Sequence, residues 1–427
     1  MIVWAEESEI GWSILGALVD PDGQLIPPGV FFINAWDATQ NDPDVAWDGS
    51  DYVVVYMDAR NYAGSGEDVY ASRVAPDGAV ADPVGFPVTR AASDQDYPRV
   101  ACGEGRCLTI WDDARNAGPL QTYGAWIDGE TVSPADAFPV CAPPCEHRVA
   151  SNRLPEKGGR FRRRLDGCPP TGRAASLRND RYAGRDNHPS RGDVAFRGWG
   201  KPPAVELAAD PAGLFGVWSK LAGWVPSHDD IVGAFLTNDL HAAGDPASLV
   251  FQVNEQFLPR VAWGEGSGLI VWRDFRFLTY AAEIYATRVS PDGGLLDVPP
   301  IPIYTGGDAW YAEVAYGAGN YLVVYKDPRL VVPHFFTLIA PDGTNLYPGG
   351  APLFTDYDDA DKFVLAFNGT DFVIVYELTD WDYPVSDYIN TRLIAADGSW
   401  HSPIRVSSWM NSAIRRWVTS PAPRRIA

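Results

Sequence analysis

The chain has few residues of the kinds that usually carry metal, redox or nucleophilic chemistry. Its 427 residues include only 6 His, 5 Cys and 3 Met. The histidines show no metal-ligand spacing: His147, His188, His228, His241, His334 and His401. No GxSxG, no P-loop, and no GxGxxG between a strand and a helix occurs. The sequence therefore lacks the common motifs of nucleophilic hydrolases, nucleotide-binding sites and zinc sites.

Long apolar runs and basic charge are also scarce. No run of 18 apolar residues occurs, so no membrane-spanning helix is expected. Lys and Arg number 34 against 55 Asp and Glu, a formal charge of -21. Nucleic acid is excluded as a partner on this ground, because its phosphates would be repelled.

One stretch recurs along the chain. The sequence VAWDGSDYVVVYMDAR begins at Val45 and returns as VACGEGRCLTIWDDAR at Val100, VAWGEGSGLIVWRDFR at Val261 and VAYGAGNYLVVYKDPR at Val314. A more divergent copy, LAFNGTDFVIVYELTD, begins at Leu365. Such an internal repeat is the main signal for the fold.

Each repeat predicts four short strands. A Gly-rich turn joins two apolar strands, an alternating third strand follows (DVYASRV from Asp68), an Asp-Gly turn ends it, and a short fourth strand such as FPVT comes last. Four strands per roughly 50 residues is typical of a β-propeller. The sequence therefore predicts one all-β propeller domain over residues 1–427.

Counting first strands predicts eight blades, with seven as the alternative. Starts are visible at 45, 100, 149, 205, 261, 314 and 365. An eighth blade would combine the N-terminal strands with a strand near residues 412–419. Because Met1 already stands in strand register, we expect any export signal to lie upstream, and an incomplete fragment of a larger repeat protein stays an open interpretation.

Residues 153–201 interrupt the pattern. They hold 11 Arg and 2 Lys against 5 acidic residues and few large apolar ones. Three interpretations remain open: a disordered basic insert that binds an acidic partner, a degenerate blade, and translation out of frame. We expect a disordered or degenerate insert and assign its arginines no function.

Two cysteines indicate in which cellular compartment the protein works. Cys102 and Cys107 replace residues that face each other across the first hairpin in other repeats, such as Trp47 and Tyr52. A disulfide between them is expected, which is typical of an exported protein. Cys141 and Cys145 form CAPPC without a second pair, so zinc is not expected.

The sharpest repeated pattern is an Asp-x-Arg pair after the second strand. A ring of acids and bases around a central site is one interpretation. A structural role is favoured, because residues present once per blade serve what every blade needs. The pairs are Asp58 and Arg60, Asp113 and Arg115, Asp274 and Arg276, and Asp327 and Arg329.

Loops after the second and fourth strands vary, and those after the fourth are acidic and aromatic. They contain Asp42, Asp94, Asp96 and Asp308 beside aromatic rings. Aromatic faces beside carboxylates suit sugars. The candidate ligand face is Trp36, Tyr97, Trp310, Tyr311, Tyr357 and Trp381. Asp356, Asp358, Asp359 and Asp361 form a weak calcium candidate; otherwise no cofactor is expected.

The blade pattern and the VSPDGG turn at Ser290 resemble bacterial secreted β-propeller repeat proteins, loosely of the TolB-like and WD40-like class. This resemblance implies the fold more than the function. We expect a non-catalytic, monomeric, exported or cell-surface module that binds a glycan or a protein. The alternative is a glycoside hydrolase or lyase-like enzyme with an acidic central cleft.

Overall fold

The computed structural model describes most of the chain as β-structure. The residues described are 1–8, 11–34, 36, 38–103, 106–116, 121–140, 205–210, 213–221, 229–236, 247–250, 256–277, 281–330, 333–354, 360–380, 386–399, 404–410 and 417–419. Within these ranges every regular element is a strand. Nothing in them forms a helix long and apolar enough to cross a membrane.

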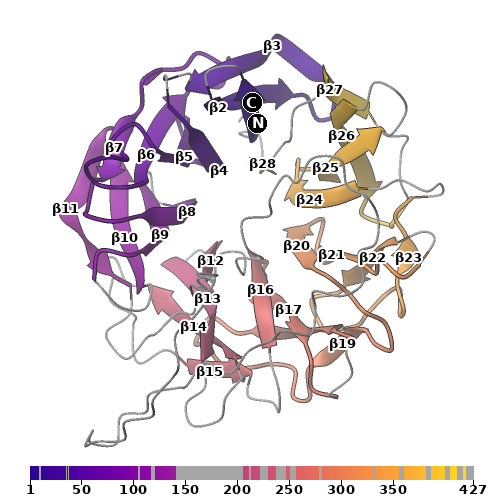
Figure 1. Ribbon diagram of the computed structural model, residues 1–427. Coiled ribbons are helices and arrows are strands. Elements are labelled where there is room, and N and C mark those ends of the chain that lie inside the picture. Colours follow the sequence, from indigo (N-terminus) through magenta and orange to yellow (C-terminus); the bar gives the residue numbers. More distant parts are fainter. Residues whose placement is uncertain are drawn as a thin grey trace, which may run out of the picture.

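Seven four-stranded antiparallel sheets stand in a ring around a central axis (Figure 1). Blade 1 is composite and takes its inner strand from the C-terminal end. From the axis outward its strands are β28 (Trp417–Thr419), β1 (Ile2–Ser8), β2 (Gly11–Val19) and β3 (Leu25–Asn34). The remaining blades follow the chain in order.

The other six blades, each given from its inner to its outer strand, have the following bounds. Blade 2 is β4 (Gln40–Trp47), β5 (Tyr52–Asp58), β6 (Asp68–Val74) and β7 (Phe86–Thr89), and blade 3 is β8 (Gln95–Gly103), β9 (Arg106–Asp113), β10 (Gln121–Asp128) and β11 (Thr131–Pro139). Blade 4 is β12 (Val205–Asp210), β13 (Gly213–Leu221), β14 (Asp229–Leu236) and β15 (Ala247–Val250), and blade 5 is β16 (Gln256–Trp263), β17 (Gly268–Asp274), β18 (Glu283–Val289) and β19 (Ile301–Tyr304). Blade 6 is β20 (Ala312–Gly317), β21 (Asn320–Lys326), β22 (His334–Ile339) and β23 (Ala351–Pro352), and blade 7 is β24 (Ala360–Phe367), β25 (Asp371–Asp380), β26 (Ser386–Ala395) and β27 (Ile404–Met410).

The second strand of each blade is apolar on both faces because it packs between two neighbouring sheets. All seven residues of β5 are buried. Val54 and Tyr56 join a cluster with blade 1, whereas Val53 and Val55 join one with Trp111 of blade 3. A strand covered on both sides reads as a continuous apolar run, which is why the repeat was visible in the sequence.

The composite blade closes the ring as predicted. β28 pairs antiparallel with β1, with Trp417 opposite Trp4 and Thr419 opposite Ile2. The closure joins the first and last parts of the chain by backbone hydrogen bonds.

The prediction of eight blades is wrong, and the alternative of seven is confirmed. Blade 3 packs directly on blade 4: Leu108 and Trp126 share a buried cluster with Leu214 and Trp218. The two inner strands are joined as well, by Arg99 and Glu206. No room is left between these sheets for the unit expected at Val149, which lies with residues 153–201 outside the described part of the chain.

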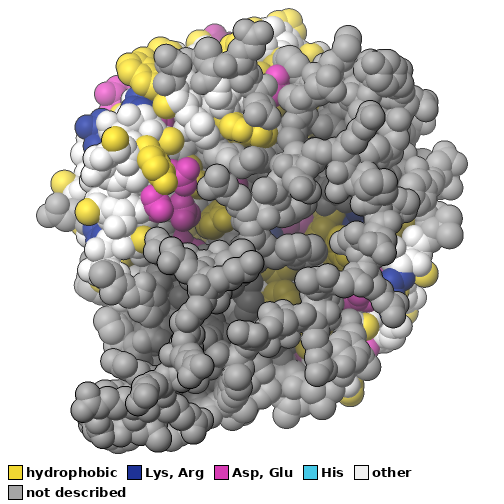
Figure 2. All heavy atoms as spheres, in the orientation of Figure 1, with side chains coloured by type: hydrophobic (Ala, Val, Ile, Leu, Met, Phe, Trp, Pro, Cys, Tyr) yellow, Lys and Arg dark blue, Asp and Glu magenta, His cyan; other side chains and the backbone are white. Residues whose placement is uncertain are grey.

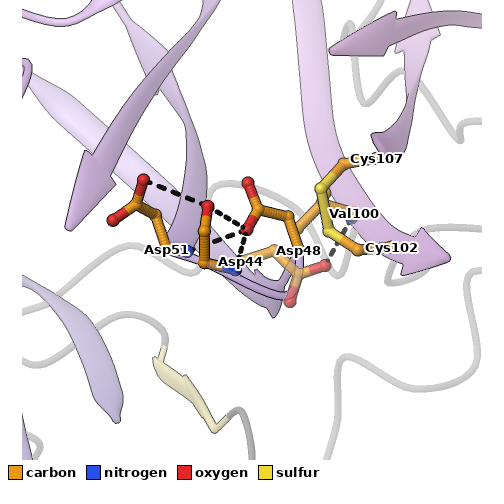
Figure 3. Close-up of a disulfide and its surroundings, with 7 residues drawn as sticks. Asp44, Asp48, Asp51, Val100, Cys102 and Cys107 are labelled. Carbon is orange, nitrogen blue, oxygen red and sulfur yellow. Dashed lines mark hydrogen bonds between the residues drawn. A yellow bond between two sulfur atoms is a disulfide. The ribbon is translucent and has the colours of Figure 1, made fainter. Parts of the chain in front are cut away.

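A disulfide links Cys102 and Cys107 (Figure 3). The two residues are direct partners across β8 and β9, as the hairpin alignment predicted. The bond therefore staples the innermost hairpin of blade 3, beside the point where the Val100 amide meets Asp44 of blade 2.

Candidate functional site

The inner strands of three blades carry a bulge with the same sequence signature. Each begins with a buried Gln and continues to a Pro three residues later: Gln40, Gln95 and Gln256 precede Pro43, Pro98 and Pro259. The strand register shifts within each of these segments. The residue before the Pro has a positive φ, 47° at Asp42, 54° at Tyr97 and 56° at Leu258. Bulges of this kind re-aim side chains next to functional sites.

Directly after the bulge, charged side chains form a belt around the axis. Asp44, Arg99, Glu206, Arg260 and Glu313 come from five consecutive inner strands and stand opposite apolar residues of the second strands. Arg260 contacts Glu313 at 2.8 Å and Glu206 at 3.1 Å, and Arg99 contacts Glu206 at 3.6 Å. We call these five residues the inner belt.

Electrostatics in the belt are those of buried ion pairs. Burial raises the pKa of Asp44 to about 6, against the attraction of Arg99 and the hydrogen bond from the Val100 amide. Burial also raises the pKa of Glu313, although Arg260 opposes the rise. The belt links neighbouring blades across the axis, which is a sufficient reason for its alternating charges.

A second group of acids lies at the start of β8, where Tyr97 is surrounded by carboxyl groups. Burial, followed by the charges of Asp42, Asp96, Asp112 and Glu67, raises the pKa of the Tyr97 phenol to about 12. We call these four acids, with Asp94, the acid rim. In the view of Figure 2, acidic side chains gather beside hydrophobic ones over the position of β8.

Backbone contacts fix the acid rim. Glu67 ends the loop between β5 and β6, and its amide donates to Asp94 Oδ1 at 3.2 Å. The Gln95 amide donates to the Glu67 carbonyl at 2.8 Å. Gly66 has a φ of 92°, and a Cβ there would lie 2.5 Å from Asp94 Oδ1, so only glycine allows this approach. A loop of blade 2 is thereby held against the first strand of blade 3.

Asp96 is a carboxyl group of the acid rim whose pKa is strongly raised. Burial, the charges of Glu67 and Asp94, a hydrogen bond with Glu67 and the charge of Asp112 all raise its pKa well above the usual range for an acid. Asp96 and Asp112 are direct partners across β8 and β9, so their side chains lie on the same face of the sheet. Asp96 therefore holds its proton to a higher pH than an ordinary carboxyl group does.

Asp112 is almost fully buried, at 4% exposure. Burial raises its pKa from 3.8 to about 7, against the attraction of Arg99, and Asp113 adds repulsion. A carboxyl group whose pKa is higher in the folded state stabilises the fold below its unfolded pKa, and this contribution is lost as the pH rises toward 7.

Replacing Asp112 with Asn should therefore stabilise the protein at alkaline pH and have little effect in acid. We expect the variant to gain about 1–3 kcal/mol in the free energy of unfolding at pH 8 relative to wild type. The difference should shrink at pH 5, where Asp112 is protonated in the fold. Urea unfolding of both proteins at the two pH values measures this, and an equal difference at both would show that the carboxyl group is ionised throughout.

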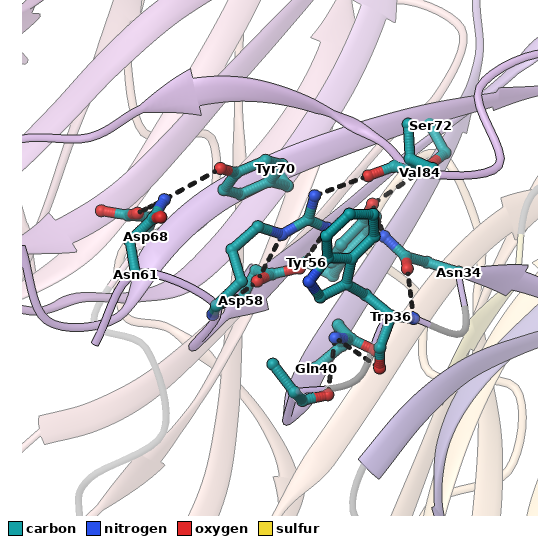
Figure 4. Close-up of polar contacts among 12 residues, drawn as sticks. Asn34, Trp36, Gln40, Tyr56, Asp58, Asn61, Asp68, Tyr70, Ser72 and Val84 are labelled. Carbon is teal, nitrogen blue, oxygen red and sulfur yellow. Dashed lines mark hydrogen bonds and ion pairs between the residues drawn. The ribbon is translucent and has the colours of Figure 1, made fainter. Parts of the chain in front are cut away.

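The repeated Asp-x-Arg pairs form clasps within single blades. In each, the Arg backbone amide and Nε donate to Asp Oδ1, and Nη2 contacts Asp Oδ2 at 2.6 to 2.9 Å. In three blades the guanidinium also covers a ring of the third strand: Arg60 on Tyr70, Arg115 on Tyr123 and Arg276 on Tyr285. Figure 4 shows the clasp of blade 2 around Asp58 and Tyr70.

Only part of the predicted ligand face falls within the described residues. Trp36 and Trp310 are exposed, at 44% and 38%. Tyr311 instead packs its ring on Phe363, 4.9 Å between centroids. Tyr97 is surrounded by the acid rim, and Tyr357 and Trp381 lie outside the described residues.

The calcium candidate cannot be placed. Asp356, Asp358 and Asp359 lie outside the described residues, as does the side chain of Asp361. Within the described ranges, no group of three or more His, Cys, Asp or Glu side chains could hold a metal ion.

Sequence reasoning missed the acid rim as a unit. Asp42, Asp94, Asp96 and Tyr97 stood out as members of acidic loops, but Glu67 and Asp112 did not. The Gln-x-x-Pro signature, repeated at 40–43, 95–98 and 256–259, marks the inner strands where the site begins and could have located it.

No family model matches the chain, and no curated protein matches it. Among solved structures, a puromycin hydrolase matches with a TM-score of 0.48 and 13% identity, covering 94% of this chain and 51% of that one. A Penicillium chrysogenum α-L-arabinanase complexed with arabinobiose matches with a TM-score of 0.42 and 12% identity, covering 78% of this chain and 87% of that one. A thermostable family-43 glycoside hydrolase matches with a TM-score of 0.39 and 14% identity, covering 84% of this chain and 91% of that one. Likeness at this level transfers no activity.

The expectation of a non-catalytic binding module finds no support in these structures, which share only the fold with this chain. The similar structures include a family-43 glycoside hydrolase, an α-L-arabinofuranosidase and arabinanases. The alternative interpretation is an enzyme of the glycoside hydrolase or lyase kind with an acidic central cleft, and we compare it below with the geometry of the acid rim.

Proposed function

We propose that the chain is a glycoside-cleaving propeller enzyme whose acid–base chemistry takes place at the acid rim. One observation carries the proposal: Asp96 is half-buried and surrounded by Glu67, Asp94 and Asp112, and burial with these neighbours raises its pKa to about 8. Cleavage of a glycosidic bond needs a carboxylic acid that can protonate the leaving oxygen near neutral pH. The asymmetry of the rim supports this, because no other described blade has its set of acids.

The proposed roles follow from position. Asp96 is the general acid, and Glu67 raises the pKa of Asp96 and orients its proton. Asp42, on the neighbouring inner strand and facing the same Tyr97 phenol, is the candidate base that activates water. The charges of Asp42 and Asp96 both act on Tyr97, and burial with these charges raises the pKa of its phenol to about 12. Asp112, nearly buried, acts on Asp96 only through its charge.

The compartment is part of the proposal. A disulfide at the innermost hairpin supports work outside a reducing cytoplasm. The ring closes on itself through β28 and β1, which supports a monomer.

A panel of neutral and acidic polysaccharides tests the proposal. We expect new reducing ends from at least one substrate, with saturated products for a hydrolase. Products carrying a new double bond would instead establish the lyase form. Binding of a polysaccharide without any release of ends over prolonged incubation at pH 5 to 8 would overturn the proposal.

A further inference from the structure

Trp36 is an exposed aromatic ring held in a fixed position. It lies between β3 and β4 and is 44% exposed. Its amide donates to Asn34 Oδ1 at 3.0 Å, and its carbonyl accepts from Gln40 Nε2 at 3.5 Å. The backbone on both sides of the ring is therefore tied to the sheet.

The inner face of the indole ring is covered by a cation that is itself immobilised. Arg60 Cζ lies 4.7 Å from the Trp36 ring centroid and 4.1 Å from that of Tyr70. Asp58 holds the same guanidinium through two contacts, 2.8 and 2.6 Å long. The guanidinium therefore contacts both rings, Trp36 and Tyr70, which are labelled in Figure 4. We call Trp36, Arg60 and Tyr70 the stack.

Blade 3 supplies an internal comparison. Gln95 Nε2 donates to the Ala91 carbonyl at 3.2 Å, as Gln40 does to Trp36, so the two positions are equivalent. Arg115 lies on Tyr123 at 4.0 Å in the same way that Arg60 lies on Tyr70. Blade 3 is thus built with Ala where blade 2 meets a tryptophan, and packing of the clasp does not require the ring.

Two short chain segments connect the stack to the acid rim. Arg60 opens the β5–β6 loop that Glu67 closes. Gln40, which binds the Trp36 carbonyl, is two residues before Asp42. Trp36 is thus six residues before Asp42 in the chain, and Arg60 is seven residues before Glu67.

We infer that Trp36 is a stacking subsite for a sugar ring of the substrate, next to the bond that is cleaved. The inference rests on the proposed function. A sugar offers an apolar C–H face that fits a flat indole ring. Because the ring is held before the ligand arrives, little conformational entropy is lost on binding.

Binding to an uncleaved ligand tests this separately from activity. In the Asp96→Asn background, calorimetry with cellohexaose, xylohexaose and α-1,5-arabinohexaose should find one that binds. Trp36→Ala should then weaken binding about 5- to 30-fold, and Trp36→Phe by less. Phe277→Ala is the control, since Phe277 is also an exposed aromatic ring but lies outside both the acid rim and the candidate ligand face; it should leave the affinity unchanged.

Two results would overturn the inference, and they are distinguishable. Equal affinities for the Trp36→Ala and Phe277→Ala proteins would remove the subsite and leave the proposed enzyme intact. Absence of binding and of cleavage for every neutral and acidic glycan in the panel would remove both. Circular dichroism on the Trp36→Ala protein confirms that a loss of affinity is not a loss of fold.

Discussion

Replacing Asp96 with Asn is expected to lower kcat/KM for glycoside cleavage by about 10²- to 10⁴-fold, the usual contribution of a general acid. Asn has nearly the same shape but carries no transferable proton. Stability should not fall, because the wild-type side chain is already protonated at neutral pH and Asn adds no charge. Urea unfolding alongside the kinetics separates the two effects.

Leaving-group dependence sharpens this test. An aryl glycoside with an acidic phenol as leaving group needs no protonation, so the Asp96→Asn protein should lose far less activity on it than on a natural glycan. Asp292→Asn, at an exposed turn, is the control and should change neither rate. Equal losses on both substrates would show that Asp96 is not the acid.

The pH profile gives a second readout of the same pair. Removing the charge of Glu67 by Glu67→Gln should lower the pKa of Asp96, because that charge is the largest contribution after burial. The alkaline limb of the rate profile should therefore move to lower pH. A limb that does not move would mean that another group supplies the proton.

Much of the fold could be predicted because every blade repeats the same physical solution. The second strand is buried on both faces and so reads as an apolar run, as in β5. The composite blade followed from N-terminal strands that had no first strand. The disulfide followed from Cys102 and Cys107 occupying facing positions of a hairpin.

The blade count failed where the periodicity of the sequence was trusted across residues 141–204. The fragment at Val149 fitted the spacing, yet a spacing does not show whether a sheet is inserted between its neighbours. Direct packing of Leu108 on the cluster with Leu214 and Trp218 decides the matter, and such contacts are between residues far apart in the chain.

The candidate site was predicted only in pieces for a related reason. Asp112 was hidden by Asp113, whose place in the repeat drew attention, although the two point to opposite faces of β9. Glu67 lies in a loop of blade 2, and its partnership with Asp96 of blade 3 depends on how the blades meet. Residues that repeat in every blade serve the fold, whereas the acids of the candidate site come from positions at which the blades differ.

The largest effect on stability is expected at a clasp. Asp274→Asn should lower the free energy of unfolding by about 3–5 kcal/mol, because it leaves a largely buried guanidinium without its partner. Asp274 is 1% exposed and accepts from Trp272 Nε1 at 2.9 Å, and from the amide, Nε and Nη2 of Arg276. Urea unfolding at pH 7 measures the change.

The same measurement decides between the two interpretations of the repeated Asp-x-Arg pairs. A structural clasp predicts a large loss for Asp274→Asn, a strong coupling energy with Arg276→Gln in a double-mutant cycle, and a change within about 0.5 kcal/mol for the exposed Asp292→Asn. A ring of functional acids predicts the reverse, since residues held for chemistry are commonly kept at a cost to stability. If Asp274→Asn unfolds at the wild-type urea concentration but the enzyme loses activity, the pairs belong to the site and the acid rim is only part of it.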